Sequence, residues 1–203
     1  MMFFALSIDL FDYQAWHLGD IARDDMATGE NWRFVRSPMI PMDSALRDTA
    51  KGPFAVKRKG DGRPVDYTVA GYAGVPIGTF KVTRCLQGLD GFTTFPVTVE
   101  GSAQTDLLHI LHVWEVVDCF DEVKSQFQII PENDRIRPDL AGHYRSVTRL
   151  VIDAAKAQGK HLFRIARLEN RLIVSEEVKR RFEDAGVSGA VCEPVTFEGS
   201  AGA

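Results

Sequence analysis

Residues 175–200 read SEEVKRRFEDAGVSGAVCEPVTFEGS, and residues 77–102 read IGTFKVTRCLQGLDGFTTFPVTVEGS. Aligned without a gap at an offset of 98 positions, the two stretches share nine identical residues in 26, where random pairing would give about one or two. A catalytic motif is seldom needed twice in one chain, whereas a structural unit that is built twice must be encoded twice. The repeat therefore points to architecture rather than to chemistry.

The second copy carries the signals for the start of a short helix. Ser175 is a favourable N-cap residue, and Glu176 and Glu177 follow it at the positive end of the helix dipole. Both glutamates can pair with the arginines four residues further on, Arg180 and Arg181. The sequence therefore predicts a helix of about ten residues that begins after Ser175.

The end of this helix is also predicted. Gly186 can adopt the left-handed conformation that is common just after a helix, and Val187 can then fold back onto Phe182. Phe182 and Val178 form the expected buried face. A strand is predicted to follow over residues 190–197, and its proline favours an edge position or a bulge.

The first copy carries weaker signals of the same kind. Thr79 is a candidate helix cap, Phe80 is expected inside, and Gly88 is expected to stop the helix. Upstream, apolar residues recur at strand spacing in both copies: Val65 and Tyr67 in the first, Phe163 and Ile165 in the second. Each unit is therefore predicted to run strand, turn, strand, helix, strand.

Outside the repeat, residues 2–10 and 107–117 are rich in apolar and aromatic side chains and are predicted to be strands. Residues 12–62, with their prolines, glycines and charges, are expected to form a long loop with short helical pieces. Residues 144–158 fit a strand that runs into a helical turn ended by Gly159.

The predicted fold is α+β, with two related strand-strand-helix-strand halves, mixed or antiparallel sheets and few short helices. The N-terminal half, residues 1–102, contains a variable acidic segment, and the C-terminal half is residues 103–203. We expect the halves to form one compact domain built from a pseudo-repeat.

Composition narrows the class of protein. The chain has 203 residues, of which 45% are hydrophobic and 26% charged, and its formal net charge of -4 argues against a nucleic-acid binder. Its three cysteines are far apart and form no CxxC motif, so neither a disulfide framework nor a zinc site is indicated. No apolar run is long enough to span a membrane, and the start of the chain lacks the charges of a signal peptide. We expect a cytoplasmic protein, with homo-oligomerisation left open.

Each residue that could take part in catalysis or metal binding also has a purely structural explanation. His109 and His112 stand three residues apart, and in a strand they face opposite sides and cannot hold a metal together. Cys119 with a histidine could form a thiol dyad, but it lies in an apolar run, where a packed thiol is common. The glycine-rich residues 71–78 lack the P-loop and GxGxxG spacings and are interpreted as a turn. No catalytic residue, metal or cofactor is predicted.

Acidic residues gather near the N-terminus. Residues 1–50 carry eight acidic and four basic side chains, with acids at Asp9, Asp12, Asp20, Asp24, Asp25 and Glu30. Such a group is usually solvated surface, and it also suits a basic partner.

Several stretches resemble a known family: WEVVDCFDEVKSQF at residues 114–127 and HLFRIARLENRLIVSEEVKRRFEDAGVSGAVCEPV at residues 161–195. They are similar to the family of bacterial polymorphic toxin systems often labelled immunity protein eleven. The shared features are a VDC-x-D-x-x-x-S segment, an LFR strand, an IVS-E/D-x-x-K helix start, a GxxG turn and a final Pro-Val. The resemblance covers about residues 65–197.

The resemblance implies a cytoplasmic, non-enzymatic antitoxin that binds a cognate toxin, often a nuclease, and occludes its active site in a 1:1 heterodimer. Acidic surface suits a basic nuclease, so we expect partner binding at Asp20, Asp24, Asp25 and Glu30. Two alternatives stay open: a small enzyme that uses Cys119 with His109 or His112, and a ligand-binding module with a cleft between the halves.

Overall fold

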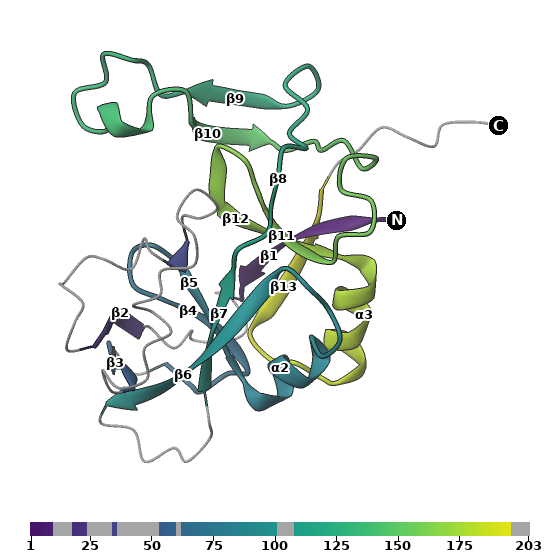
Figure 1. Cartoon of the computed structure of the whole chain (residues 1–203). Helices are drawn as coiled ribbons and strands as arrows, with labels where there is room; N and C mark the ends of the chain where they lie inside the picture. Colours follow the sequence, from purple (N-terminus) through teal and green to yellow (C-terminus); the bar gives the residue numbers. More distant parts are fainter. Residues whose placement is uncertain (10–17, 24–33, 36–52, 60–61, 101–107, 196–203) are drawn as a thin grey trace.

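The computed structural model describes residues 1–9, 18–23, 34–35, 53–59, 62–100 and 108–195 (Figure 1). Strands dominate this part of the chain, and the helices are few and short. In chain order the elements are β1 Phe3–Ile8, β2 Leu18–Ala22, β3 Phe54–Arg58, β4 Tyr67–Ala70, β5 Val75–Thr79, α2 Phe80–Cys85, β6 Phe92–Glu100, β7 Leu108–Val113, β8 Val116–Val117, β9 Gln126–Ile129, the 3-10 turn η3 Pro138–Leu140, β10 Tyr144–Arg149, β11 Leu162–Ile165, β12 Leu168–Ser175, α3 Glu176–Asp184 and β13 Ala190–Pro194.

Six strands form a closed barrel in the order β2-β3-β6-β7-β5-β4. The barrel is closed by a parallel pairing of β2 with β4, at Leu18 and Ala70. Side chains alternate along β7, so that Leu108 and Ile110 lie in the barrel core while Leu111 packs on its outer side. The described strands β2 and β3 contradict the prediction of a loop with helical pieces over residues 12–62.

The second large sheet has the order β13-β1-β12-β11-β8, and β9 and β10 form a separate hairpin. Both faces of this five-stranded sheet are buried. On β1, Phe3 faces one apolar cluster and Phe4 the other, which lies between the sheet, the two helices and the outer side of the barrel. Pro194 lies in β13 at the sheet edge, as its sequence predicted.

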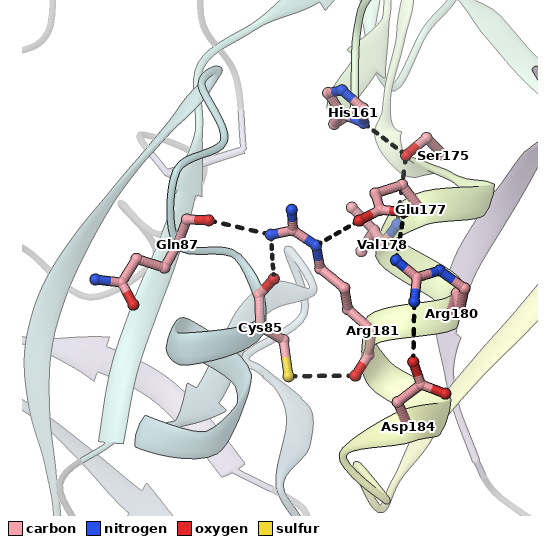
Figure 2. Close-up of polar contacts among 9 residues, drawn as sticks. All are labelled: Cys85, Gln87, His161, Ser175, Glu177, Val178, Arg180, Arg181 and Asp184. Atoms are coloured by element: carbon pink, nitrogen blue, oxygen red, sulfur yellow. Dashed lines mark hydrogen bonds and ion pairs between the residues drawn. The ribbon is translucent and has the colours of Figure 1, made fainter.

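The two helices lie on the same side of the molecule and contact each other (Figure 1). Arg181 of α3 reaches across to the end of α2, where its guanidinium donates to the carbonyls of Cys85 and Gln87, each at 3.0 Å (Figure 2). The same side chain also donates to Glu177 at 2.8 Å. One arginine therefore ties both helices together.

The predicted signals of α3 are present. The Ser175 hydroxyl accepts a bond from the Val178 amide, and Val178 and Phe182 are buried. After the helix, the Val187 amide donates to the Phe182 carbonyl at 2.9 Å, with Gly186 at φ +60°. Glu177 alone binds both arginines, Arg180 at 2.8 Å and Arg181 at 2.8 Å.

In α2 one prediction is wrong. Phe80 is 59% exposed, because the short helix turns Val82 and Cys85 toward the core instead. Thr79 precedes the helix but makes no capping bond with its side chain, which donates to Asp66 at 3.1 Å.

The two repeat segments have the same order of elements. β4, β5, α2 and β6 correspond to β11, β12, α3 and β13. In each segment an antiparallel strand is inserted between the strand before the helix and the strand after it: β7 in the first and β1 in the second. The inserted β1 comes from residues 3–8, so the N-terminus completes the sheet of the second segment.

Candidate functional site

An aromatic cluster anchors the β9–β10 hairpin to the rest of the chain. Phe120 and Tyr144 stack with ring centroids 4.0 Å apart, and Phe127 packs edge-on against both, at 5.2 and 5.0 Å. Aromatic pairs of this kind stabilise a fold beyond the area that they bury. The hairpin, which stands at the top of Figure 1, is therefore held firmly at its base.

A polar network joins this cluster to the turn between β11 and β12. Glu122 accepts a bond from the Tyr144 hydroxyl at 2.6 Å and one from the Arg167 guanidinium at 2.8 Å. These two hydrogen bonds lower the pKa of Glu122, while burial and the bond to Glu122 raise the pKa of Tyr144. The Arg167 guanidinium also lies 4.8 Å from the centre of the Tyr144 ring.

Arg167 has an uncommon backbone conformation. Its φ is +64°, and it is the sole residue other than glycine with positive φ in the described part of the chain. This conformation costs a side-chain-bearing residue about 1 to 2 kcal/mol. A bond from the Arg167 amide to Glu169 Oε1, at 3.1 Å, helps to hold the turn. Strain of this kind is often found at functional sites.

Beside this turn lies a cleft of about 730 Å³. Its walls come from several places in the fold: Asp20 of β2, the β4–β5 turn with Tyr72, the segment from Arg137 to Tyr144, and the residues from Arg167 to Asn170, with Val35 and Ile130 between them. The cleft thus lies between the barrel and the anchored hairpin, and apolar side chains line it between the charged groups.

A fully buried arginine fixes one wall of the cleft. Arg164 of β11 donates to the carbonyl of Val113 at 3.2 Å and to the carbonyl of Glu169 at 2.6 Å. Burial lowers the pKa of Arg164 to about 10. The guanidinium thus ties the start of β12, and Glu169 with it, to the end of β7.

Most charged groups of the described cleft wall lie beside a group of opposite charge. Asp139 binds Arg137 with two bonds, at 3.0 and 2.8 Å, and Glu122 binds Arg167. Glu169 Oε2 lies 3.7 Å from Nε2 of His143, and Glu169 also interacts electrostatically with the buried Arg164 guanidinium.

Asp20 is a carboxylate of the cleft wall that has no partner among the described residues. No hydrogen bond or ion pair joins its side chain to another described residue. Within the described wall, Asp20 and Glu169 are the carboxylates that form no ion pair with an arginine or lysine side chain.

The sequence prediction and the structure meet at one residue of this site. Asp20, expected at a partner surface, lies in the cleft wall, whereas Asp24, Asp25 and Glu30 lie outside the described residues. Tyr72 and Glu169 were not predicted. The glycines on either side of Tyr72 indicated a turn, but no local signal marked Glu169, which lines the same cleft as Asp20.

The histidines and cysteine considered for catalysis lie elsewhere and do not come together. His112 is buried in the barrel, with Nδ1 3.2 Å from the Phe34 carbonyl oxygen, while His109 lies on the opposite face of β7. Burial lowers the pKa of His109. Cys119 is fully buried in the cluster beneath the five-stranded sheet, and burial raises the pKa of its thiol to about 12. A thiol held in its neutral form is a poor nucleophile.

The described residues contain no group of three or more His, Cys, Asp or Glu side chains that could hold a metal ion. In the same part of the chain, no helix combines the length and the hydropathy that a membrane span requires. The glycine-rich stretch forms a turn at residues 71–74 followed by β5, as predicted.

The fold is β-rich, and Cys119 is buried in an apolar cluster that includes neither His109 nor His112. A sequence profile described as "Immunity protein family (Imm11)" matches residues 38–196. This match covers more than half of the chain, so the chain belongs to that immunity protein family. It begins further upstream than the motifs in residues 65–197 indicated. A comparison with curated proteins gives no significant match.

Membership of the family carries a coarse function. Immunity proteins bind a cognate toxin, and they are typically non-enzymatic. The chain is therefore a toxin-immunity protein, and the cleft is its candidate contact surface.

Proposed function

We propose that the chain is a cytoplasmic antitoxin that binds the toxin domain of a polymorphic toxin system as a 1:1 complex and occludes its active site. The single observation that carries the proposal is the family match over residues 38–196. We further propose that the toxin is a nuclease and that the cleft beside Asp20 contacts it.

Electrostatics support a nuclease as the partner. An enzyme that acts on nucleic acid needs a positively charged surface to hold phosphates. The carboxylates of Asp20 and Glu169 in the cleft wall complement such a surface, and the chain carries a net charge of -4. Complementary charge raises the association rate and the specificity of a complex.

The shape around the cleft supports occlusion. The β9–β10 hairpin projects from the body of the chain (Figure 1), and Ile129 and Ile136 on it are 45% and 83% exposed. Exposed apolar groups beside a charged cleft provide the mixed surface that protein interfaces use. A toxin domain seated here would be covered by the hairpin on one side and by the barrel on the other.

The experiment uses the C-terminal domain of the protein encoded directly upstream of this chain. We expect that domain to co-purify with the chain, and we expect light scattering to give the mass of a 1:1 complex. In this complex the domain should lose its activity on DNA or RNA. Failure of the wild-type chain to bind or inhibit it would contradict the proposal.

Charge reversal tests the acidic surface within that complex. Replacement of Asp20, Asp24 and Asp25 by lysine should lower the association rate constant about tenfold or more at low salt, and less at high salt. Stopped-flow mixing measures both rates. Unchanged rates would remove these residues from the interface and leave the remaining surface as the contact.

A second candidate function is the binding of a small ligand in the cleft, whose volume of about 730 Å³ lies within the range of ligand pockets. Native mass spectrometry of the chain purified from its own cells tests it. A retained small molecule, lost on mutation of Tyr72 or Glu169, would favour this function over toxin binding.

We also infer that residues 1–102 and 103–203 arose as two copies of one strand-strand-helix-strand unit. The inserted strands β7 and β1 support this, as do the two glycine pairs of the repeat, each of which has positive φ in both copies: Gly88 and Gly186, and Gly91 and Gly189.

A further inference from the structure

We infer that the cleft receives a single basic side chain, an arginine or a lysine, which inserts between Asp20 and Glu169 and passes the ring of Tyr72 at the rim. The inference rests on the proposed function, because the side chain would belong to the toxin. Nothing in the family match assigns these residues.

The balance of charge selects a cation. Arg137 and Arg167 line the cleft, but Asp139 and Glu122 already neutralise them through bonds of 2.8 to 3.0 Å. An incoming anion would have to compete with these carboxylates. A cation meets the carboxylate of Asp20, which has no partner among the described residues, and Oε2 of Glu169, which lies 3.7 Å from a ring nitrogen of His143.

The apolar lining selects a cation with a hydrocarbon stem. Between the charged groups the cleft exposes Val35, Ala73, Ile130, Leu140 and Leu168. A metal ion or ammonium ion would leave these side chains in contact with water. The three or four methylene groups of arginine or lysine can cover them while the charged head reaches the carboxylates.

Tyr72 adds an aromatic contact at the rim. Its side chain is fully exposed at the tip of the β4–β5 turn, where the fold gives it no packing role. A ring in this position can lie against a guanidinium or an ammonium group. Tyrosine and arginine are also the residue types that most often carry the binding energy of an interface.

Glu169 is positioned for this contact by backbone bonds that do not use its second carboxylate oxygen. Arg164 holds its carbonyl oxygen, and its Oε1 accepts from the Arg167 amide. Oε2 lies near His143 at 3.7 Å and can turn to a stronger donor. The turn at Arg167 therefore holds the backbone and Oε1 of Glu169 in the cleft wall.

The first experiment uses a tripeptide probe and needs no toxin. The peptide acetyl-Gly-Arg-Gly-amide is titrated into the full chain labelled with nitrogen-15, and the amide signals are followed by NMR. We expect saturable shifts at Asp20, Tyr72 and Glu169. The same peptide with citrulline, which has the shape of arginine without its charge, should bind about tenfold more weakly or not at all.

Two variants sharpen this titration. Glu169→Gln keeps an Oε1 acceptor for the Arg167 amide and should raise the dissociation constant about fivefold or more. The matched control Glu193→Gln alters an exposed carboxylate on β13, away from the cleft, and should leave the dissociation constant of the arginine peptide unchanged. Equal binding of the arginine and citrulline peptides, or stronger binding of a Gly-Glu-Gly peptide, would overturn the inference.

A second experiment uses the toxin domain. If the wild-type complex forms and Glu169→Gln, Asp20→Asn and Tyr72→Ala all bind as tightly as wild type, the inference fails and the proposed function stands. If no wild-type complex forms, the proposed function fails, and the peptide titration still decides whether the cleft takes a basic side chain. A loss of about tenfold in affinity for the toxin domain in each variant would support both the inference and the proposed function.

Discussion

The segments β5–α2–β6 and β12–α3–β13 have the same order of elements, yet one belongs to a closed barrel and the other to an open sheet. Their helices differ as well. α3 spans Glu176–Asp184, has a side-chain cap at Ser175 and carries ion pairs along its exposed face. α2 spans only Phe80–Cys85 and has no side-chain cap.

The difference shows how much of each helix is encoded locally. α3 has its cap, its acidic first turn and its terminal glycine within its own sequence. α2 depends on its neighbour, because Arg181 of α3 holds the carbonyls of Cys85 and Gln87. Closure of the barrel depends on β2 and β3, which lie outside both segments.

Among the substitutions that test this comparison of the two segments, one at Gly189 is expected to have the largest effect on stability. This residue has φ +82°, and a Cβ atom there would overlap the carbonyl oxygen of Tyr67. Neither backbone can move freely, since the Tyr67 amide also donates to the Ser188 carbonyl at 3.0 Å. Gly189→Ala should lower the free energy of unfolding by about 3 to 5 kcal/mol, measured by urea denaturation.

Two other glycines of the repeat serve as controls. Gly88 has φ +80° but open space around it, so Gly88→Ala should cost only the conformational strain of about 1 to 2 kcal/mol. Gly91, the repeat partner of Gly189, would place its Cβ 2.8 Å from the Leu162 carbonyl oxygen, and its substitution should fall between the two. Equal costs at Gly88 and Gly189 would show that the close approach to Tyr67 contributes nothing.

An effect of intermediate size is expected at Asp66, which links the two segments. Its carboxylate accepts bonds from Thr79 at 3.1 Å, Lys81 at 2.8 Å and the Ser188 amide at 2.9 Å. Burial alone would raise the pKa of Asp66, but these bonds outweigh it, and the pKa lies below its ordinary value. Asp66→Asn should lower the free energy of unfolding at pH 7 by about 2 kcal/mol.

The pH dependence of the same variant follows from the sign of the shift. A lowered folded pKa stabilises the fold above the ordinary aspartate pKa of about 3.9, and this stabilisation is lost as the pH falls through the folded value. The difference between wild type and Asp66→Asn should therefore be largest at pH 7 and smaller at pH 3. A difference that stays constant between these two pH values in urea denaturation would rule out this role for the Asp66 carboxylate.

What could be predicted from the sequence is what depends on near neighbours in the chain. The cap, buried face and terminal glycine of α3 were predicted because they lie within twelve residues of one another. The inward position expected for Phe80 was wrong, because a helix of six residues faces the core with Val82 and Cys85. The family resemblance was confirmed over residues 38–196.

The cleft could not be predicted in the same way. Its carboxylates Asp20 and Glu169 are 149 positions apart in the sequence, and the fold places both in the cleft wall. In the described part of the chain, β2 and β4 close the barrel where Leu18 pairs with Ala70, and such a short pairing leaves no periodic signal in the sequence. Asp20 was predicted as a binding residue because other acidic residues lie near it in the sequence. Those residues gave no indication that Glu169 lines the same cleft.

The smallest expected effect compares the two helix caps directly. The Ser175 hydroxyl is buried, accepts from the Val178 amide at 3.4 Å and lies 2.9 Å from Nδ1 of His161 (Figure 2). Ser175→Ala should lower the free energy of unfolding by about 1 to 2 kcal/mol and speed hydrogen exchange at the first amides of α3.

The matching change in the first segment, Thr79→Ala, should cost about 1 kcal/mol or less, because the Thr79 hydroxyl bonds to Asp66 and caps nothing. Hydrogen exchange at the start of α2 should stay as in wild type, since no amide there loses a partner. If Thr79→Ala instead sped exchange across α2, the helix would depend on a local cap after all, and the distinction between a self-capped α3 and a neighbour-held α2 would fail.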